Sequence, residues 1–122
     1  MSEHDSRWMY RQVIDAMVVS CSGAGQVSAE RIRVGVWNDN AAPDDLRQTA
    51  LNRLVAGLDA DQRDALAVVL AEEFASGMFN ALEVLQAAQL EPFRAGYDGD
   101  PSDDFLGRLD GWSWPEDGSA RG

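Results

Sequence analysis

The fold is decided by residues 59–89, which read DADQRDALAVVLAEEFASGMFNALEVLQAAQ. Large apolar side chains recur every three or four positions along this stretch, which predicts one long amphipathic helix over 60–89. They are Leu66, Leu70, Phe74, Met78, Leu82 and Leu85, with Val69 and Val84 widening the apolar face. Asp59 and Gln62 have the spacing of a capping box, in which each side chain binds the other residue's backbone N–H.

Gly77 lies in the middle of this helix and has two interpretations. Glycine costs about 1 kcal/mol in a helix interior, so it either permits close packing against another helix or marks a break. A second capping-box spacing, from Asn80 to Glu83, makes a kink near Gly77 credible.

A second helix is expected over 44–57, after the loop that ends at Pro43. Its buried stripe is predicted to be Leu46, Leu51, Leu54, Val55 and Leu58. Because only two or three residues connect it with the long helix, the two should form an antiparallel hairpin over about 44–89.

Two further segments precede the hairpin. A helix should begin at Asp5 or Ser6 and end at Gly23 in the left-handed conformation. Residues 28–37 are ambiguous, because Ile32, Val34 and Val36 alternate as in an edge strand, whereas Ser28 and Gly35 suit a short helix near 29–34. The helix is favoured because a strand with no mate leaves backbone groups unpaired, but the strand stays open.

After residue 91 the chain becomes strongly acidic. Ser102 is expected to cap a helix over 103–110 that ends at Gly111, with Phe105, Leu106 and Leu109 facing the body of the protein. Trp112 and Trp114 should hold the C-terminal segment in place, and 116–122 should be a disordered acidic tail. The predicted fold is all-α, a small bundle of four to five helices in a single domain over 1–115.

The composition excludes several classes of function. The chain has 122 residues and a net charge of −11, which disfavours nucleic acid and anionic membranes as partners. Its basic residues are all arginine and it is rich in alanine, which is typical of a high-GC genome. The lone cysteine, the acidic N-terminus and the short apolar runs favour a cytoplasmic protein without a membrane span.

Few chemistries remain for an active site. His4 is the only histidine and lies near the N-terminus, which removes histidine-based catalysis, and Cys21 has no activating neighbour and is expected to be a buried apolar side chain. The paired acids Glu72–Glu73 and Asp44–Asp45 show no sign of the split pKa values that carboxylate catalysis requires. We therefore expect no enzymatic activity and no cofactor.

A weak metal candidate lies in the acidic segment. Asp98, Asp100, Ser102 and Asp104 have the alternate spacing that begins a calcium loop, but Asp103 and Leu109 stand where such a loop needs glycine and glutamate. The simpler interpretation is a turn that leads into a capped helix.

The hypothesis for function is a non-enzymatic protein-binding module, an antidote or inhibitor of a basic partner. The residues expected to bind the partner are Trp37, Asp98, Asp100, Asp103, Asp104, Arg108, Trp112 and Trp114. The alternatives are a self-associating structural domain with no ligand, such as a homodimer, and a carboxylate-based metal-binding protein. Whether the acidic C-terminal region binds a partner or only favours solubility stays open.

Two segments resemble a family of small bacterial proteins of uncharacterised function. They are Leu58-Asp-Ala-Asp-Gln-Arg63 and Asp104-Phe-Leu-Gly-Arg108-Leu-Asp-Gly111-Trp-Ser-Trp114-Pro115. The resemblance covers about residues 50–115 and implies no activity, ligand or catalytic residue. It implies that Arg108 is held in the structure by a carboxylate or an aromatic face.

Overall fold

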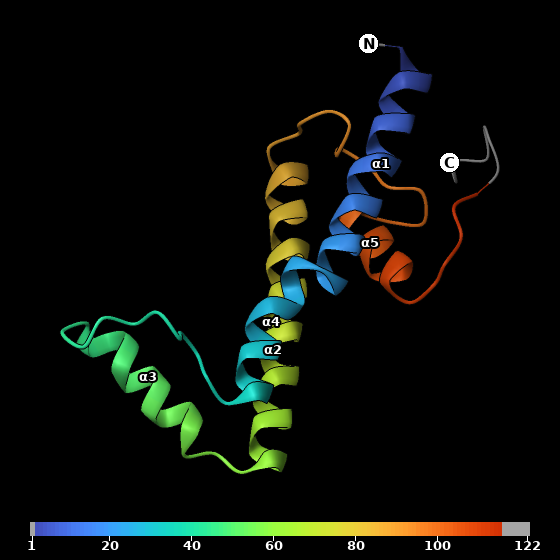
Figure 1. Ribbon diagram of the computed structural model, residues 1–122. Helices are drawn as coiled ribbons and strands as arrows, with labels where there is room; N and C mark the ends of the chain where they lie inside the picture. Colours follow the sequence, from blue (N-terminus) through green and yellow to red (C-terminus); the bar gives the residue numbers. More distant parts are fainter. Residues whose placement is uncertain (1, 116–122) are drawn as a thin grey trace. The chain divides into compact units, whose positions relative to one another are not determined.

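The computed structural model describes residues 2–115 and contains no β-strand in that range (Figure 1). The all-α prediction is confirmed. The α-helices are α1 (Glu3–Ser22), α2 (Val27–Val34), α3 (Leu46–Ala56), α4 (Ala60–Ala87) and α5 (Pro101–Leu109), and the 3₁₀ helix η1 (Ala24–Gln26) lies between α1 and α2. The tail expected over 116–122 lies outside the described residues.

The chain divides into two compact units. Unit 1 contains residues 2–20 and 76–115, and unit 2 contains Cys21–Ala75. The boundaries fall near the end of α1 and within α4, so this is not a division into two consecutive domains. The single domain expected over 1–115 stays a prediction.

The long helix α4 begins as the sequence predicts. The N–H of Gln62 donates to the Asp59 carboxylate at 2.8 Å, and the N–H of Asp59 donates to the Gln62 side chain at 3.0 Å. The helix continues through Gly77, so the prediction of one long helix is confirmed and the alternative of a break is not. A Cβ atom at Gly77 would meet nothing within 4 Å, so Gly77 does not serve close packing either.

By length and composition, α4 could cross a membrane. It has 28 residues and a mean hydropathy of 1.4 over its most apolar 18-residue window, although its uninterrupted apolar runs are short. This is weak evidence, because the core helix of a soluble protein meets the same criterion. Glu72 and Glu73 lie near the middle of α4, where a charged side chain disfavours insertion by about 2.5–3.5 kcal/mol.

The core of unit 2 joins three helices. Ala29 and Ile32 from α2, Val55 from α3 and Ala67 from α4 are buried together, and Trp37, Leu66 and Leu70 pack against them. The chain reverses between α3 and α4, and the two helices diverge from this short connection like an open V (Figure 1).

The predicted apolar stripes of α3 and α4 are partly wrong. In α3, Leu46 and Leu54 are exposed and only Val55 is fully buried. In α4, Val69 and Val84 are exposed as well. Buried positions therefore occupy a narrower strip of each helix than the sequence pattern indicates.

Residues 27–34 form a helix, which decides the ambiguity over 28–37. Gly35 ends α2 with φ 86°, and its N–H donates to the carbonyls of Arg31 and Ile32. This left-handed cap is the ending that favoured the helix over the strand.

The predicted start of α1 is wrong, whereas its end, directly before Gly23, is confirmed. The helix begins at Glu3, where the Ser2 hydroxyl accepts the N–H of Asp5, so Ser2 is the N-terminal cap. Gly23 has φ −102° and ψ −101°, which is not the left-handed conformation expected of it. It caps η1 instead, and the chain turns without a left-handed residue there.

The predicted start of α5 is also wrong. Asp100, followed by Pro101, caps the helix, and the N–H of Asp100 donates to the Asp103 carboxylate at 3.1 Å in a capping box. Ser102, the expected cap, is buried inside the first turn. Phe105 faces the core as predicted, whereas Leu106 and Leu109 are exposed.

Alanine at Gly35 and at Gly77 should have opposite effects on stability. A Cβ at Gly35 would lie 2.8 Å from the Arg63 guanidinium, and φ there is left-handed, so Gly35→Ala should lower the free energy of unfolding by about 1–2 kcal/mol. Gly77→Ala is the matched control and should raise it by about 0.5–1 kcal/mol, because the helix interior has open space. Urea denaturation measures both, and equal effects at the two positions would contradict this account.

Candidate functional site

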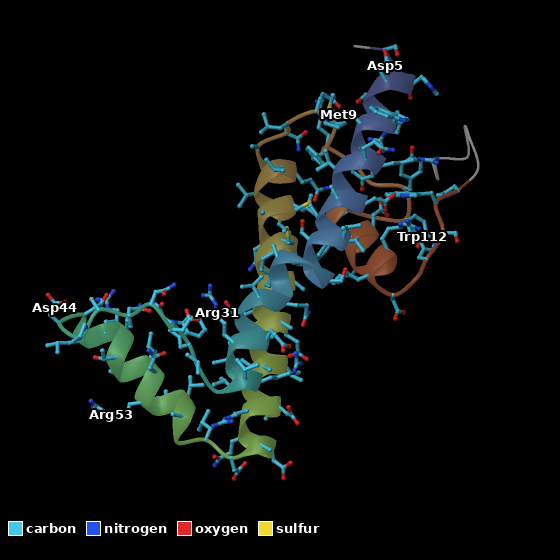
Figure 2. All side chains as sticks on the ribbon, viewed as in Figure 1. Asp5, Met9, Arg31, Asp44, Arg53 and Trp112 are labelled. Carbon is cyan, nitrogen blue, oxygen red and sulfur yellow. The ribbon has the colours of Figure 1, made fainter. Side chains whose placement is uncertain are left out.

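One side of α1 carries the polar residues on which unit 1 is built. Arg7, Arg11 and Asp15 follow one another at four-residue spacing, and Tyr10 lies three positions after Arg7, which places all four along one side of the helix. Each contacts a residue of the C-terminal segment 92–115. We call this set of contacts the clasp. Met9 lies on a different side of α1 from Trp112, a residue of the C-terminal segment (Figure 2).

The Asp104 carboxylate is the centre of the clasp. It is 1% exposed and accepts the Tyr10 hydroxyl at 2.5 Å, the N–H of Tyr97 at 2.7 Å and the N–H of Asp98 at 2.9 Å. Burying a carboxylate is costly unless it is hydrogen-bonded, and these three donors supply that compensation. Asp104 therefore fixes the loop before α5 and attaches it to α1.

The loop closes on Asp104 because of a glycine. A Cβ atom at Gly96 would lie 2.6 Å from the Asp104 Oδ2 and 2.6 Å from the carbonyl of Gly99. Only a residue without a side chain allows the backbone to approach so closely. The Gly96 N–H donates to that same Gly99 carbonyl at 2.9 Å, which closes the turn.

Tyr10 is fully buried, and its surroundings favour the neutral phenol. Burial raises the pKa of Tyr10 well above 10.0, and the hydrogen bond and charge of Asp104 raise it further, while Arg7 lowers it in part. The Tyr10 ring also contacts the rings of Phe93, Tyr97 and Trp114 at centroid distances of 5.8–5.9 Å. Tyr10 is thus a permanent hydrogen-bond donor over the ordinary range of pH.

Arginines hold the backbone of the C-terminal segment. Arg7 donates to the carbonyls of Pro92 and Ala95, and Arg11 donates to the Tyr97 hydroxyl and to the Pro115 carbonyl at 2.9 Å. Both guanidinium groups also lie over the Tyr97 ring, at 5.1 and 4.8 Å from its centroid. Arginine suits this task because its planar group can stack and donate at the same time.

Asp15 holds the end of the segment. One of its carboxylate oxygens accepts Arg108 Nε at 2.7 Å and the other accepts Trp114 Nε1 at 2.9 Å. The Arg108 guanidinium lies 5.4 Å from the Trp114 ring centroid and also donates to the Trp112 carbonyl. The prediction that Arg108 is held in the structure is confirmed, with Asp15 as its carboxylate. Trp114 holds the C-terminal segment against α1 as predicted, whereas the contacts of Trp112 are with Gly107, Arg108 and Trp114 of its own segment.

The polar groups of the clasp bind one another. Among the described residues, no buried side-chain nitrogen or oxygen lacks a hydrogen-bond partner. Cys21 lies in unit 2, is half-buried rather than fully buried as expected, and has a pKa raised by burial, which disfavours the reactive thiolate. The arrangement can hold chain segments together.

The weak calcium candidates serve the backbone. Asp104 spends its oxygens on the three donors named above, Asp100 caps α5, and Ser102 is buried. Within residues 2–115 no three histidine, cysteine or acidic side chains gather as metal ligands would. The simpler interpretation, a turn that leads into a capped helix, describes this segment.

The structure separates the residues expected to bind a partner. Trp37 lies in unit 2, where it packs against the core and lies 5.9 Å from Arg31. The others lie in unit 1. Of these, Asp98, Asp100 and Asp103 are exposed, whereas Asp104 is buried and is therefore not part of a surface that a partner could reach.

Sequence reasoning missed the α1 half of the clasp. None of Arg7, Tyr10, Arg11 and Asp15 is among the site residues that the sequence predicts. A signal was present, because charged residues flank a tyrosine on one helix face and aromatic residues are frequent near the C-terminus. Charged residues on a helix are usually solvated, however, and nothing in the sequence indicates that these lie 85 or more positions from their partners.

Comparison with known proteins assigns the chain to a family. Residues 3–116 match the model of a family of unknown function (DUF6547). The chain belongs to this family. The match covers all five α-helices and every residue of the clasp, and it confirms that the relatives form a family without assigned function. The particular motifs quoted for the resemblance stay a prediction. No curated protein and no solved structure matches the chain.

Removing the Asp104 charge should destabilise the fold strongly. Asp104→Asn replaces one acceptor oxygen by an N–H₂ group, so a buried donor loses its partner, and the free energy of unfolding should fall by about 3 kcal/mol. Tyr10→Phe leaves the backbone donors of Asp104 in place and should cost about 1.5 kcal/mol. Asp110→Asn, an exposed control, should change stability by less than about 0.5 kcal/mol. A neutral Asp104→Asn variant in urea denaturation would contradict the central role of Asp104.

The protein should lose stability in alkali through Tyr10. Its pKa is raised in the folded state, so its contribution is complete below the unfolded tyrosine pKa of about 10. Above that pH only the unfolded chain loses the proton, and stability should fall by up to about 1.4 kcal/mol per pH unit. Urea denaturation between about pH 8 and pH 11 measures this slope. Tyr10→Phe should make the slope shallower, and an unchanged slope would show that other groups cause the loss.

Proposed function

We propose that the protein is a non-enzymatic protein-binding module that binds a basic protein partner, as an antidote or inhibitor does. The observation that carries this proposal is how the structure divides its charges. Among residues 2–115 every acidic side chain is exposed except those of Asp15 and Asp104. Of the nine arginine side chains that the structure describes, five are exposed, and four are half-buried and engaged within the chain.

The engaged arginines bind carbonyls, carboxylates and aromatic rings. In unit 1, Arg7, Arg11 and Arg108 serve the clasp, and in unit 2 Arg63 donates to the carbonyls of Val55 and Ala56. These four arginine side chains are half-buried, whereas all the described acidic side chains except Asp15 and Asp104 are exposed. The surface is therefore more acidic than the composition indicates. Such a surface attracts a cationic partner and speeds its association.

The completeness of the clasp supports a binding role over an enzymatic one. Catalytic groups usually have perturbed pKa values and open access to a substrate. Here the strongly perturbed group is Tyr10, which is fully buried and bound to Asp104. A cytoplasmic location, with no nucleic acid or membrane as partner, is part of this proposal.

The contact with the partner is proposed to include the start of α5. Asp98, Asp100 and Asp103 are exposed there, and Asp104 fixes the loop that carries them. A rigid loop binds with less loss of conformational freedom than a flexible one. Trp112 is half-buried in the clasp and presents a large side chain of the kind that interfaces favour.

The test begins with cross-linking of the tagged full chain in its native cells, followed by identification and purification of the bound protein. We expect one basic protein whose dissociation constant rises with salt, because exposed charges are screened. The double variant Asp98→Asn with Asp103→Asn should raise that constant about tenfold, since rim charges steer binding. Asparagine keeps a side-chain oxygen for the cap, so the fold should persist.

The matched control is Asp39→Asn with Asp44→Asn, which removes the same charge from an exposed loop of unit 2. It should change the dissociation constant by less than about twofold. An acidic or neutral partner, or equal effects of the two double variants, would count against the proposed surface.

A further inference from the structure

Helix α3 exposes an apolar row. Leu46, Ala50 and Leu54 follow one another at four-residue spacing, so they lie on one face of the helix. Leu46 is 79% exposed and Leu54 is 58% exposed. Large exposed apolar side chains in a row on one helix commonly mark an interaction surface.

Two arginines flank this row. Arg47 and Arg53 are exposed, and α3 contains no acidic residue. The side chains of the other arginines that the structure describes each have a hydrogen bond, ion pair or ring contact, whereas none is found for the side chains of these two. Figure 2 shows Arg53 extending from α3 on the side away from α4. In a chain of net charge −11, α3 thus presents a basic and apolar face.

Helix α4 presents the complementary face within the same unit. Val68 and Val69 are 48% and 51% exposed. Asp61 and Glu72 lie seven positions before and four positions after Val68, which places them on its side of the helix, and both are exposed. The unit 2 part of α4 therefore has an acidic and apolar face.

The two faces cannot satisfy each other within one chain. The opposite sides of α3 and α4 carry Val55 and Ala67, which are buried in the shared core of unit 2. Since the inner sides of both helices are occupied there, their outer faces point away from that core. A partner for each face has to come from another molecule.

We propose that unit 2 is a dimerisation surface, in which α3 of one copy packs against α4 of the second copy and the reverse. In a dimer with a two-fold axis each contact between α3 and α4 occurs twice. Such a dimer can form because both complementary faces lie on the same compact unit. Leu46 and Leu54 then pack on Val68 and Val69, and Arg47 and Arg53 meet Asp61 and Glu72. The contact is independent of the basic partner and uses none of the clasp residues.

Sedimentation equilibrium of the purified full chain, without other proteins, tests this surface. We expect a dimer whose dissociation constant rises about tenfold or more in Arg53→Glu and likewise in Glu72→Arg, because each change places like charges together. Combining the two changes exchanges the charges and should restore the constant to within about threefold of the original. Leu54→Ser should also weaken the dimer, while Val84→Ser, at an exposed position of unit 1, should not.

Circular dichroism and melting of each variant identify any that lose the monomer fold, and the two charge changes, at exposed positions, keep the test valid if Leu54→Ser unfolds. A strict monomer at the highest attainable concentration would overturn the proposal. A dimer whose dissociation constant is unchanged in all of these variants would also overturn it. The same holds for a monomer whose α3 binds anionic lipid vesicles.

Discussion

The structure of unit 1 depends on the buried carboxylate of Asp104. Its oxygens accept hydrogen bonds from the Tyr10 hydroxyl of α1 and from two backbone N–H groups of the loop before α5. A buried carboxylate needs hydrogen-bond donors close to it. One of these donors, the Tyr10 hydroxyl, lies 94 positions away from Asp104 in the chain. The aromatic rings of Tyr10, Tyr97 and Trp114 then exclude water from this bond. Arg7 and Arg11 donate hydrogen bonds to backbone carbonyls of the C-terminal segment.

The same demand for compensation explains why the protein has an acidic surface and a fully paired interior. Arginine has several donors on a planar group, so a half-buried arginine can bind backbone carbonyls and a ring together. Arg11 does so in the clasp. Cations used in this way no longer balance the carboxylates at the surface. The net charge of −11 is therefore displayed mostly outward, and the proposed basic partner follows from that display.

Unit 2 follows a different principle. Its core is small, with Ala29, Ile32, Val55 and Ala67 buried together, and α3 contributes only Val55 to it. A helix that is buried on one side can leave apolar groups exposed on the other, and the row of Leu46 and Leu54 is such a case. The arginines of α3 and the acids of α4 give these exposed rows opposite charge. The proposed dimer rests on that complementarity.

The sequence by itself determined the helices whose signals are local. The capping box of Asp59 and Gln62, the short connection before α4 and the glycine end of α2 were all predicted, because each depends on atoms a few residues apart. Local signals also misled, since Ser102 resembles a cap and is buried, while the true cap is Asp100. Only the tertiary structure decided which charged residues are buried. Whether Asp15, Arg11 or Asp104 faces water depends on partners 85 or more positions away, and no spacing in the sequence records that distance.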